Sequence, residues 1–148
     1  DAKACQVLSC FELARRLASY QEFRREVLSP KDVVEMFKGE MSFLKKEVFI
    51  GVYLNTRNCV IRKEEISVGT LDKSLVHPRD VFGPALTDGA KSLILVHNHP
   101  SGDAEVSAED RSTTRRLQRV GRLLGIELLD HVVVGAGCYT SFLEEGWL

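Results

Sequence analysis

The sequence lacks several features that would place it in a special structural class. None of its four cysteines, at positions 5, 10, 59 and 138, pairs with another at Cys-x-x-Cys spacing, which excludes zinc ribbons and thioredoxin-like motifs. No apolar run approaches the ~20 residues of a membrane-spanning helix. Neither sign of charge dominates, because 20 Lys and Arg stand against 21 Asp and Glu. A protein that coats nucleic acid through a uniformly basic surface is therefore excluded.

The start of the chain and its thiols give an expectation about location. The first residue is Asp1 and not Met, so we expect a fragment or a processed form. No charged segment with an apolar stretch behind it opens the chain, and a secretory signal is not expected. Cysteines spaced in this way in a chain of this size are expected to be free thiols. Together these observations predict a cytoplasmic protein with no membrane partner.

The composition that is present is that of an ordinary folded domain. Of 148 residues, 44% are hydrophobic and 28% are charged, which is typical of a globular protein and not of a disordered or fibrous one. A chain of this length buries roughly 68–70% of the surface that it exposes when unfolded. One compact domain with a core that needs no metal or disulfide support is expected.

Apolar periodicity and breaker residues predict alternating helices and strands. Helices are expected over residues 9–19, from Pro30 to about Gly39, from Pro78 toward Thr87, and from Ser107 to Leu124. Pro84 should shorten or kink the third of these. Strands are expected over residues 48–54, 59–68, 93–96, 126–134 and 138–142. The order predicts an α/β or α+β domain with a mixed sheet.

One segment carries a candidate metal site. His97 and His99 stand two residues apart at the end of an apolar strand, so both imidazoles should lie on one face. Pro100 and Gly102 turn the chain, which can bring Asp110, in the first turn of the next helix, back over the histidines. Two histidines and one aspartate leave a fourth tetrahedral position open, the pattern of a catalytic zinc site. Water on zinc has a pKa near ~7 and is a nucleophile at neutral pH.

Such a reaction also needs a general base and a donor to the developing oxyanion. Ser107 offers a hydroxyl at the end of the loop for the second role, and a carboxylate outside the metal ligands would serve the first. Ser107 and Asp110 also have the Ser-x-x-Asp spacing of a helix capping box. Both roles are compatible, because one Asp110 oxygen can cap while the other binds metal.

The pattern His-x-His, seven residues, Ser, two residues, Asp resembles the JAMM signature of JAB/MPN metalloproteases. Further blocks resemble the bacterial RadC family in order and spacing: Val68-Gly69-Thr70-Leu71, His77-Pro78-Arg79, His97 to Gly102, Leu129-Asp130-His131 and Ser141-Phe142. The resemblance covers about residues 29–148. It implies a JAB/MPN-type α/β domain, a mixed sheet flanked by helices and similar in architecture to cytidine deaminase-like folds. Residues 1–28 resemble the end of the helix-hairpin-helix-like region that precedes this domain in the family.

The resemblance also implies roles for single residues. His97, His99 and Asp110 would bind Zn²⁺. The JAMM glutamate lies at the start of the first strand after a helix, which is Glu47 here, with Glu65 as the alternative. Glu47 would act as general base, and Ser107 would support the oxyanion.

Zinc-dependent hydrolysis of a peptide or isopeptide bond, in an unidentified peptide or protein substrate, is therefore the leading interpretation. The RadC name is attached to DNA repair, although no residue here reads DNA. One alternative is a metal-dependent nuclease or phosphoesterase acting on DNA. It would need the arginines that recur at helical spacing, more simply interpreted as a solvated face: Arg111, Arg115, Arg119 and Arg122.

A second alternative is a non-catalytic interaction module that binds DNA-repair proteins. The retained ligand residues argue against it. Zinc deaminases are disfavoured because their His-x-Glu and Pro-Cys-x-x-Cys signature is absent. Asp130 and His131 are interpreted as a buried, hydrogen-bonded structural pair and not as a second metal site.

Overall fold

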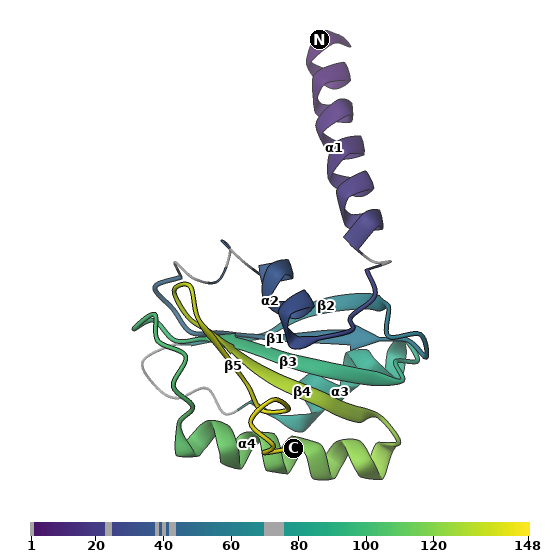
Figure 1. Ribbon diagram of the computed structural model, residues 1–148. Coiled ribbons are helices and arrows are strands. Elements are labelled where there is room, and N and C mark those ends of the chain that lie inside the picture. The colour runs from purple at the N-terminus through teal and green to yellow at the C-terminus, as the bar shows by residue number, and fades with distance from the viewer. Residues whose placement is uncertain (1, 23–24, 38, 40, 42–43, 70–75) are drawn as a thin grey trace.

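A mixed β-sheet with helices on both faces forms the body of the computed structural model (Figure 1), which describes residues 2–22, 25–37, 39, 41, 44–69 and 76–148. The five strands lie in the order β2-β1-β3-β4-β5. Along the chain the elements are α1 (Ala2–Glu22), α2 (Pro30–Phe37), β1 (Val48–Leu54), β2 (Val60–Val68), α3 (Pro78–Thr87), β3 (Ser92–Asn98), α4 (Ala108–Leu124), β4 (Glu127–Val134) and β5 (Tyr139–Ser141).

The predicted order of elements and the α/β fold class are confirmed. The strand predicted over residues 48–54 has those bounds. The helix expected over 9–19 is longer, Ala2–Glu22. Of the two effects expected at Pro84, a shortening or a kink, the shortening is wrong, because α3 runs through this proline to Thr87. Pro84 lies only two turns from the start of a ten-residue helix, where the missing N–H removes a single bond from the first turn.

The strand pairing places β3 at the centre of the sheet. β1 is antiparallel to β2 and to β3, β3 is parallel to β4, and β4 is antiparallel to β5. A parallel pair needs a crossover connection, which α4 supplies between β3 and β4. The end of β3 and the start of α4 therefore lie at the same end of the sheet, where the parallel strands β3 and β4 finish.

Side chains that alternate along the strands divide the core between the two sheet faces. On one face α2 packs over β1, β3 and β4, and its apolar side meets Val52, Val96 and Val132. On the other face α3 and α4 cover Phe49 and Leu95. Figure 1 shows α2 on one side of the sheet and α3 with α4 on the other. His97 alternates with Val96 and so faces α3 and α4.

Helix α1 projects away from the sheet (Figure 1) and exposes Val7, Leu8, Phe11 and Leu13. The chain after it joins the domain at once, because Val60 N–H donates to the Arg25 carbonyl and Val27 N–H to the Asn58 carbonyl. The domain boundary predicted between residues 28 and 29 stays a prediction. In the described part of the chain, no helix has the length and apolar character that a bilayer crossing requires.

Candidate metal centre

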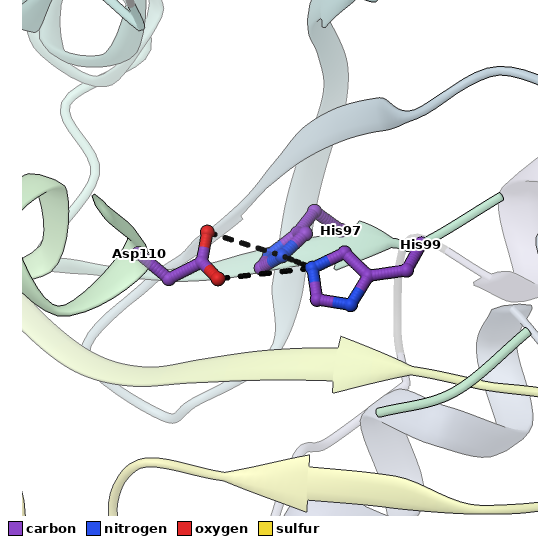
Figure 2. A group of neighbouring side chains, drawn as sticks. All are labelled: His97, His99 and Asp110. Carbon is purple, nitrogen blue, oxygen red and sulfur yellow. Dashed lines mark hydrogen bonds and ion pairs between the residues drawn. The ribbon is translucent and has the colours of Figure 1, made fainter. Parts of the chain in front are cut away.

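The candidate ligands come from the end of β3 and the start of α4. His97 lies in β3 and is fully buried, and His99 follows the strand by one residue. Gly102 N–H donates to the His99 carbonyl at 2.9 Å, closing a turn in which Gly102 has a φ of +81° that favours glycine. The turn leads into α4, whose first turn supplies Asp110. Figure 2 shows the Asp110 carboxylate facing both imidazoles.

The three side chains offer ligand atoms that converge on one point, the metal point. His97 Nε2 and His99 Nε2 lie 3.0 Å apart. Asp110 Oδ1 is 3.4 Å from His97 Nε2, and Oδ2 is 3.7 Å from His99 Nε2. Two nitrogens bound to one tetrahedral zinc at 2.0–2.1 Å would stand about 3.3 Å apart. Two facing lone pairs repel unless a proton or a cation lies between them, so the donor set fits a divalent metal ion.

Asp110 divides its two oxygens between the helix and this point. Oδ2 accepts the Ser107 backbone N–H at 2.8 Å and the Ser107 hydroxyl at 2.6 Å, and Ser107 Oγ accepts the Asp110 N–H. The pair forms the capping box that the sequence predicts. Oδ1 is left for the histidines. In this arrangement the Ser107 hydroxyl proton points to Asp110 and not to solvent.

Burial sets the protonation of His97. Enclosure lowers its pKa to about 4; the Asp110 carboxylate opposes this shift and His99 adds to it. The imidazole is therefore neutral at pH 7 and keeps one nitrogen lone pair for a metal. Neutral imidazole is the form that binds zinc.

A carboxylate orients the second histidine from the solvent side. Asp103 Oδ1 lies 3.2 Å from His99 Nδ1. Hydrogen bonds from the Ser101 hydroxyl, from His99 and from the Glu105 backbone lower the pKa of Asp103, so it is an anion at neutral pH. An anionic acceptor at Nδ1 holds the proton there and leaves Nε2 for the metal point.

A third histidine, His131, supports His97 from β4. Its Nε2 lies 2.8 Å from His97 Nδ1, and its Nδ1 lies 2.6 Å from Thr114 Oγ1. Phe142 stacks on the ring at 4.8 Å and Phe49 lies tilted against it at 5.3 Å. Full burial holds the pKa of His131 well below its ordinary value, and the nearby histidines lower it further.

Asp130 and His131 are both buried and joined by a hydrogen bond, as the sequence predicts, although their side chains have different partners. The hydrogen bond between them joins the His131 backbone N–H to Asp130 Oδ1, at 2.7 Å. Successive strand residues point to opposite faces, so the two side chains separate. Asp130 instead accepts from the Ser141 hydroxyl at 2.6 Å and from the Leu143 N–H at 2.9 Å. Burial raises the pKa of this carboxyl, against the effect of those bonds.

Glu47, the candidate base, stands directly before β1, and hydrogen bonds from other segments fix the backbone around it. The Asn98 side chain accepts from Val48 N–H at 2.9 Å and donates to the Lys46 carbonyl at 3.1 Å. Gly69 N–H donates to the Glu47 carbonyl at 2.6 Å, and a Cβ on Gly69 would stand 3.2 Å from that oxygen. The close approach explains a glycine here. Thr70 and Leu71 of the same block lie outside the described residues.

The pKa of Glu47 responds to the charges of the candidate ligands. Partial covering raises its pKa, the positive form of His99 lowers it, and the Asp110 and Glu109 carboxylates raise it. Glu65, the alternative base, pairs with Ile50 in β2. Ile50 faces the α2 side of the sheet, and Glu65 therefore lies on the face opposite to His97.

The arginines of α4 have different surroundings. Arg111 stacks on the Trp147 indole at 3.5 Å. Arg116 donates to the Val76 carbonyl at 2.7 Å. Arg115, Arg119 and Arg122 are exposed. Some arginines of this helix therefore pack against the domain and others are solvated. This arrangement does not by itself support a DNA-binding stripe.

Sequence comparison agrees with this geometry. Residues 27–147 match the family described as the RadC-like JAB domain. The chain belongs to this family. A UPF0758 protein of Methanosarcina mazei is 47% identical over 148 residues, which is 99% of this chain and 65% of that relative. A UPF0758 protein of Rubrobacter xylanophilus is 51% identical over 149 residues, 65% of its length. This RadC-like JAB domain thus spans about two thirds of the curated relatives that it matches.

Proposed function

We propose that this RadC-like JAB domain is a zinc-dependent hydrolase that cleaves peptide or isopeptide bonds. The convergence of His97, His99 and Asp110 carries the proposal, because their ligand atoms lie within 4.8 Å of one another. Three protein ligands leave one tetrahedral position for water or substrate, as in catalytic sites. When bound, zinc supplies Lewis acidity, which activates water and polarises a carbonyl. The cysteine spacing favours a reducing compartment, so we propose the cytoplasm as the place of action.

Glu47 is the general base of the proposed reaction. It takes the proton from the attacking water as the water oxygen bonds to the carbonyl carbon, and it returns this proton to the amine as the C–N bond breaks. A carboxyl with a raised pKa suits both halves of this transfer. Asn98 and Gly69 support the role, since both fix the backbone of Glu47 next to the histidine strand.

Ser107 is the proposed donor to the oxyanion. Its hydroxyl lies 2.6 Å from Asp110 Oδ2, at the rim of the metal point. Rotation about its Cα–Cβ bond redirects this proton toward a substrate oxygen. The Ser107 backbone N–H still holds Asp110 in place during the rotation, because it makes its own bond at 2.8 Å.

A substrate survey with the zinc-loaded protein tests the proposal. A library of peptides and isopeptide-linked peptides is incubated with the wild type and with Glu47→Gln, and products are identified by mass spectrometry. Cleavage by the wild type that falls about 10²–10⁴-fold in the variant supports the hydrolase. Single- and double-stranded DNA is offered in parallel, and cleavage of DNA alone would replace the peptidase with a nuclease. No turnover of any substrate, with zinc bound, would favour an interaction module.

A further inference from the structure

Three hydrogen bonds in series join the backbone of α4 to a candidate ligand. Thr114 Oγ1 lies 2.6 Å from the Asp110 carbonyl oxygen and 2.6 Å from His131 Nδ1. His131 Nε2 lies 2.8 Å from His97 Nδ1. Thr114, His131 and His97 are all buried, so no water competes freely for these groups.

The chemistry of the groups fixes the direction of every bond in the series. A carbonyl oxygen only accepts, so the single Thr114 hydroxyl proton is donated to Asp110. Thr114 Oγ1 must then accept from His131 Nδ1–H. The His131 ring, enclosed by Phe49 and Phe142, is neutral and carries one N–H. Its Nε2 is therefore an acceptor, and His97 Nδ1–H is the donor.

We infer that His131 and Thr114 are positioning residues that fix the tautomer of His97, so that its Nε2 lone pair faces the metal point. The ring nitrogen of a histidine that carries the proton is set by the hydrogen bond that the other nitrogen makes. The inference rests on the proposed function only in taking Nε2 of His97 as a metal ligand. It assigns to the Leu129-Asp130-His131 block a role at the metal centre.

The series of hydrogen bonds has one alternative state, in which each ring proton has moved to the other ring nitrogen. The Thr114 hydroxyl disfavours this state. Without the Thr114 hydroxyl, the His131 proton can move from Nδ1 to Nε2. His131 would then donate to His97 Nδ1, and the His97 proton would pass to Nε2, where it blocks metal binding. His99 does not depend on the series, because Asp103 orients it separately.

Two variants of Thr114 separate this role from a packing role. Thr114→Val keeps the side-chain shape and removes the hydroxyl, whereas Thr114→Ser keeps the hydroxyl and removes a methyl group. The tautomer of His97 is read in the zinc-free protein from the ¹⁵N chemical shifts of its ring. Zinc affinity is measured by competition with a chromophoric chelator, and folding is checked by circular dichroism.

We expect the wild type and Thr114→Ser to show a protonated Nδ1 and a bare Nε2 on His97. Thr114→Val should shift the proton toward Nε2 and weaken zinc binding by about 10–100-fold, the usual effect of losing a group that orients a ligand. A folded Thr114→Val protein with wild-type tautomer signals and zinc affinity would overturn the inference. Failure of the wild type to bind zinc would overturn the proposed function instead, while the tautomer signals still decide this one.

Variants of His131 provide the same test if Thr114→Val does not fold. His131→Phe fills the aromatic cage and removes the acceptor for His97, so it should lose the Nδ1–H signature and the zinc affinity. His131→Gln offers an amide oxygen to His97 Nδ1–H and should restore part of both. Equal tautomer signals and zinc affinity in Phe and Gln variants would contradict the inference.

Discussion

The Asn98 side-chain amide bonds the backbone on both sides of Glu47, through Val48 N–H at 2.9 Å and the Lys46 carbonyl at 3.1 Å. Asn98 stands between His97 and His99 on the same strand end. Its side chain alternates to the other face of the sheet, so the segment that directs two imidazoles to one face also anchors the candidate base. Three consecutive residues therefore supply two of the three candidate ligands and hold the backbone beside the candidate base.

Asn98→Ala should uncouple these functions. The variant leaves the Val48 N–H and the Lys46 carbonyl without their partner, which should lower the free energy of unfolding by about 1–3 kcal/mol. Turnover should fall because Glu47 is less well held, while zinc content stays at the wild-type level. Urea unfolding, metal analysis and kinetics measure the three quantities. Asn98→Asp keeps the acceptor for the Val48 N–H, so its stability and turnover should lie between those of the wild type and of Asn98→Ala. Wild-type turnover in Asn98→Ala would refute the role of Asn98 in holding Glu47.

Glu47→Gln should separate catalysis from metal binding. The amide keeps the size of the side chain but accepts no proton, so hydrolysis should fall about 10²–10⁴-fold at unchanged zinc content and melting temperature. Glu65→Gln is the matched control, because Glu65 lies on the other face of the sheet, and it should be as active as the wild type. His99→Ala should lose zinc and activity together. If Glu65→Gln lost activity and Glu47→Gln kept it, Glu65 and not Glu47 would be the base.

The sequence predicted most of the fold because its local signals agree with one another. The apolar run 48–54 became β1, and the Ser107 cap with Gly125 bounded α4. The length of α1 was underestimated, since the exposed apolar residues of this helix leave little periodicity to follow. The convergence of His97, His99 and Asp110 followed from strand alternation and a tight turn.

The groups that support the site were not predictable in the same way. His131 reaches His97 only because β4 lies parallel to β3 with Leu95 opposite His131. This register is a long-range property with no local signal. Thr114 looks like any threonine inside a helix, and the aspartate at 103 looks like a turn residue. The two hydrogen bonds from Asn98 to the backbone beside Glu47 likewise depend on the antiparallel pairing of β1 with β3.

Removal of the metal should leave the protein folded. The two largest apolar core clusters lie on opposite faces of the sheet, and neither includes a candidate ligand. Zinc should add stability by mass action, about 2.7 kcal/mol when free zinc is 100 times its dissociation constant. Circular dichroism and thermal unfolding before and after chelation test this. Global unfolding on chelation would contradict it.

The zinc-free protein should lose stability between pH 6.5 and about pH 4. His97 has a pKa of about 4 in the fold, against 6.5 for an ordinary histidine. Above pH 6.5 it is neutral in both states and contributes nothing. As the pH falls, the unfolded chain binds a proton that the folded chain does not, which costs about 2 kcal/mol at pH 5. His131, whose pKa is also lowered, acts in the same direction.

Denaturant unfolding at pH 7 and pH 5 measures this slope. His97→Phe is the comparison, because the His97 ring already stacks on Phe49 with an interplanar angle of 13°, and a phenyl ring suits the space. This variant should show a shallower loss of stability than the wild type. Equal slopes in the two proteins would show that His97 is not held neutral by burial.

Anomalous scattering from a zinc-soaked crystal tests the central claim most directly. The account predicts one peak at the zinc absorption edge, about 2.0–2.2 Å from His97 Nε2, His99 Nε2 and an Asp110 oxygen. Glu47 should lie near this peak without coordinating it. A peak elsewhere, or none at these three side chains in protein that binds zinc in solution, would contradict the metal centre and the hydrolase built upon it.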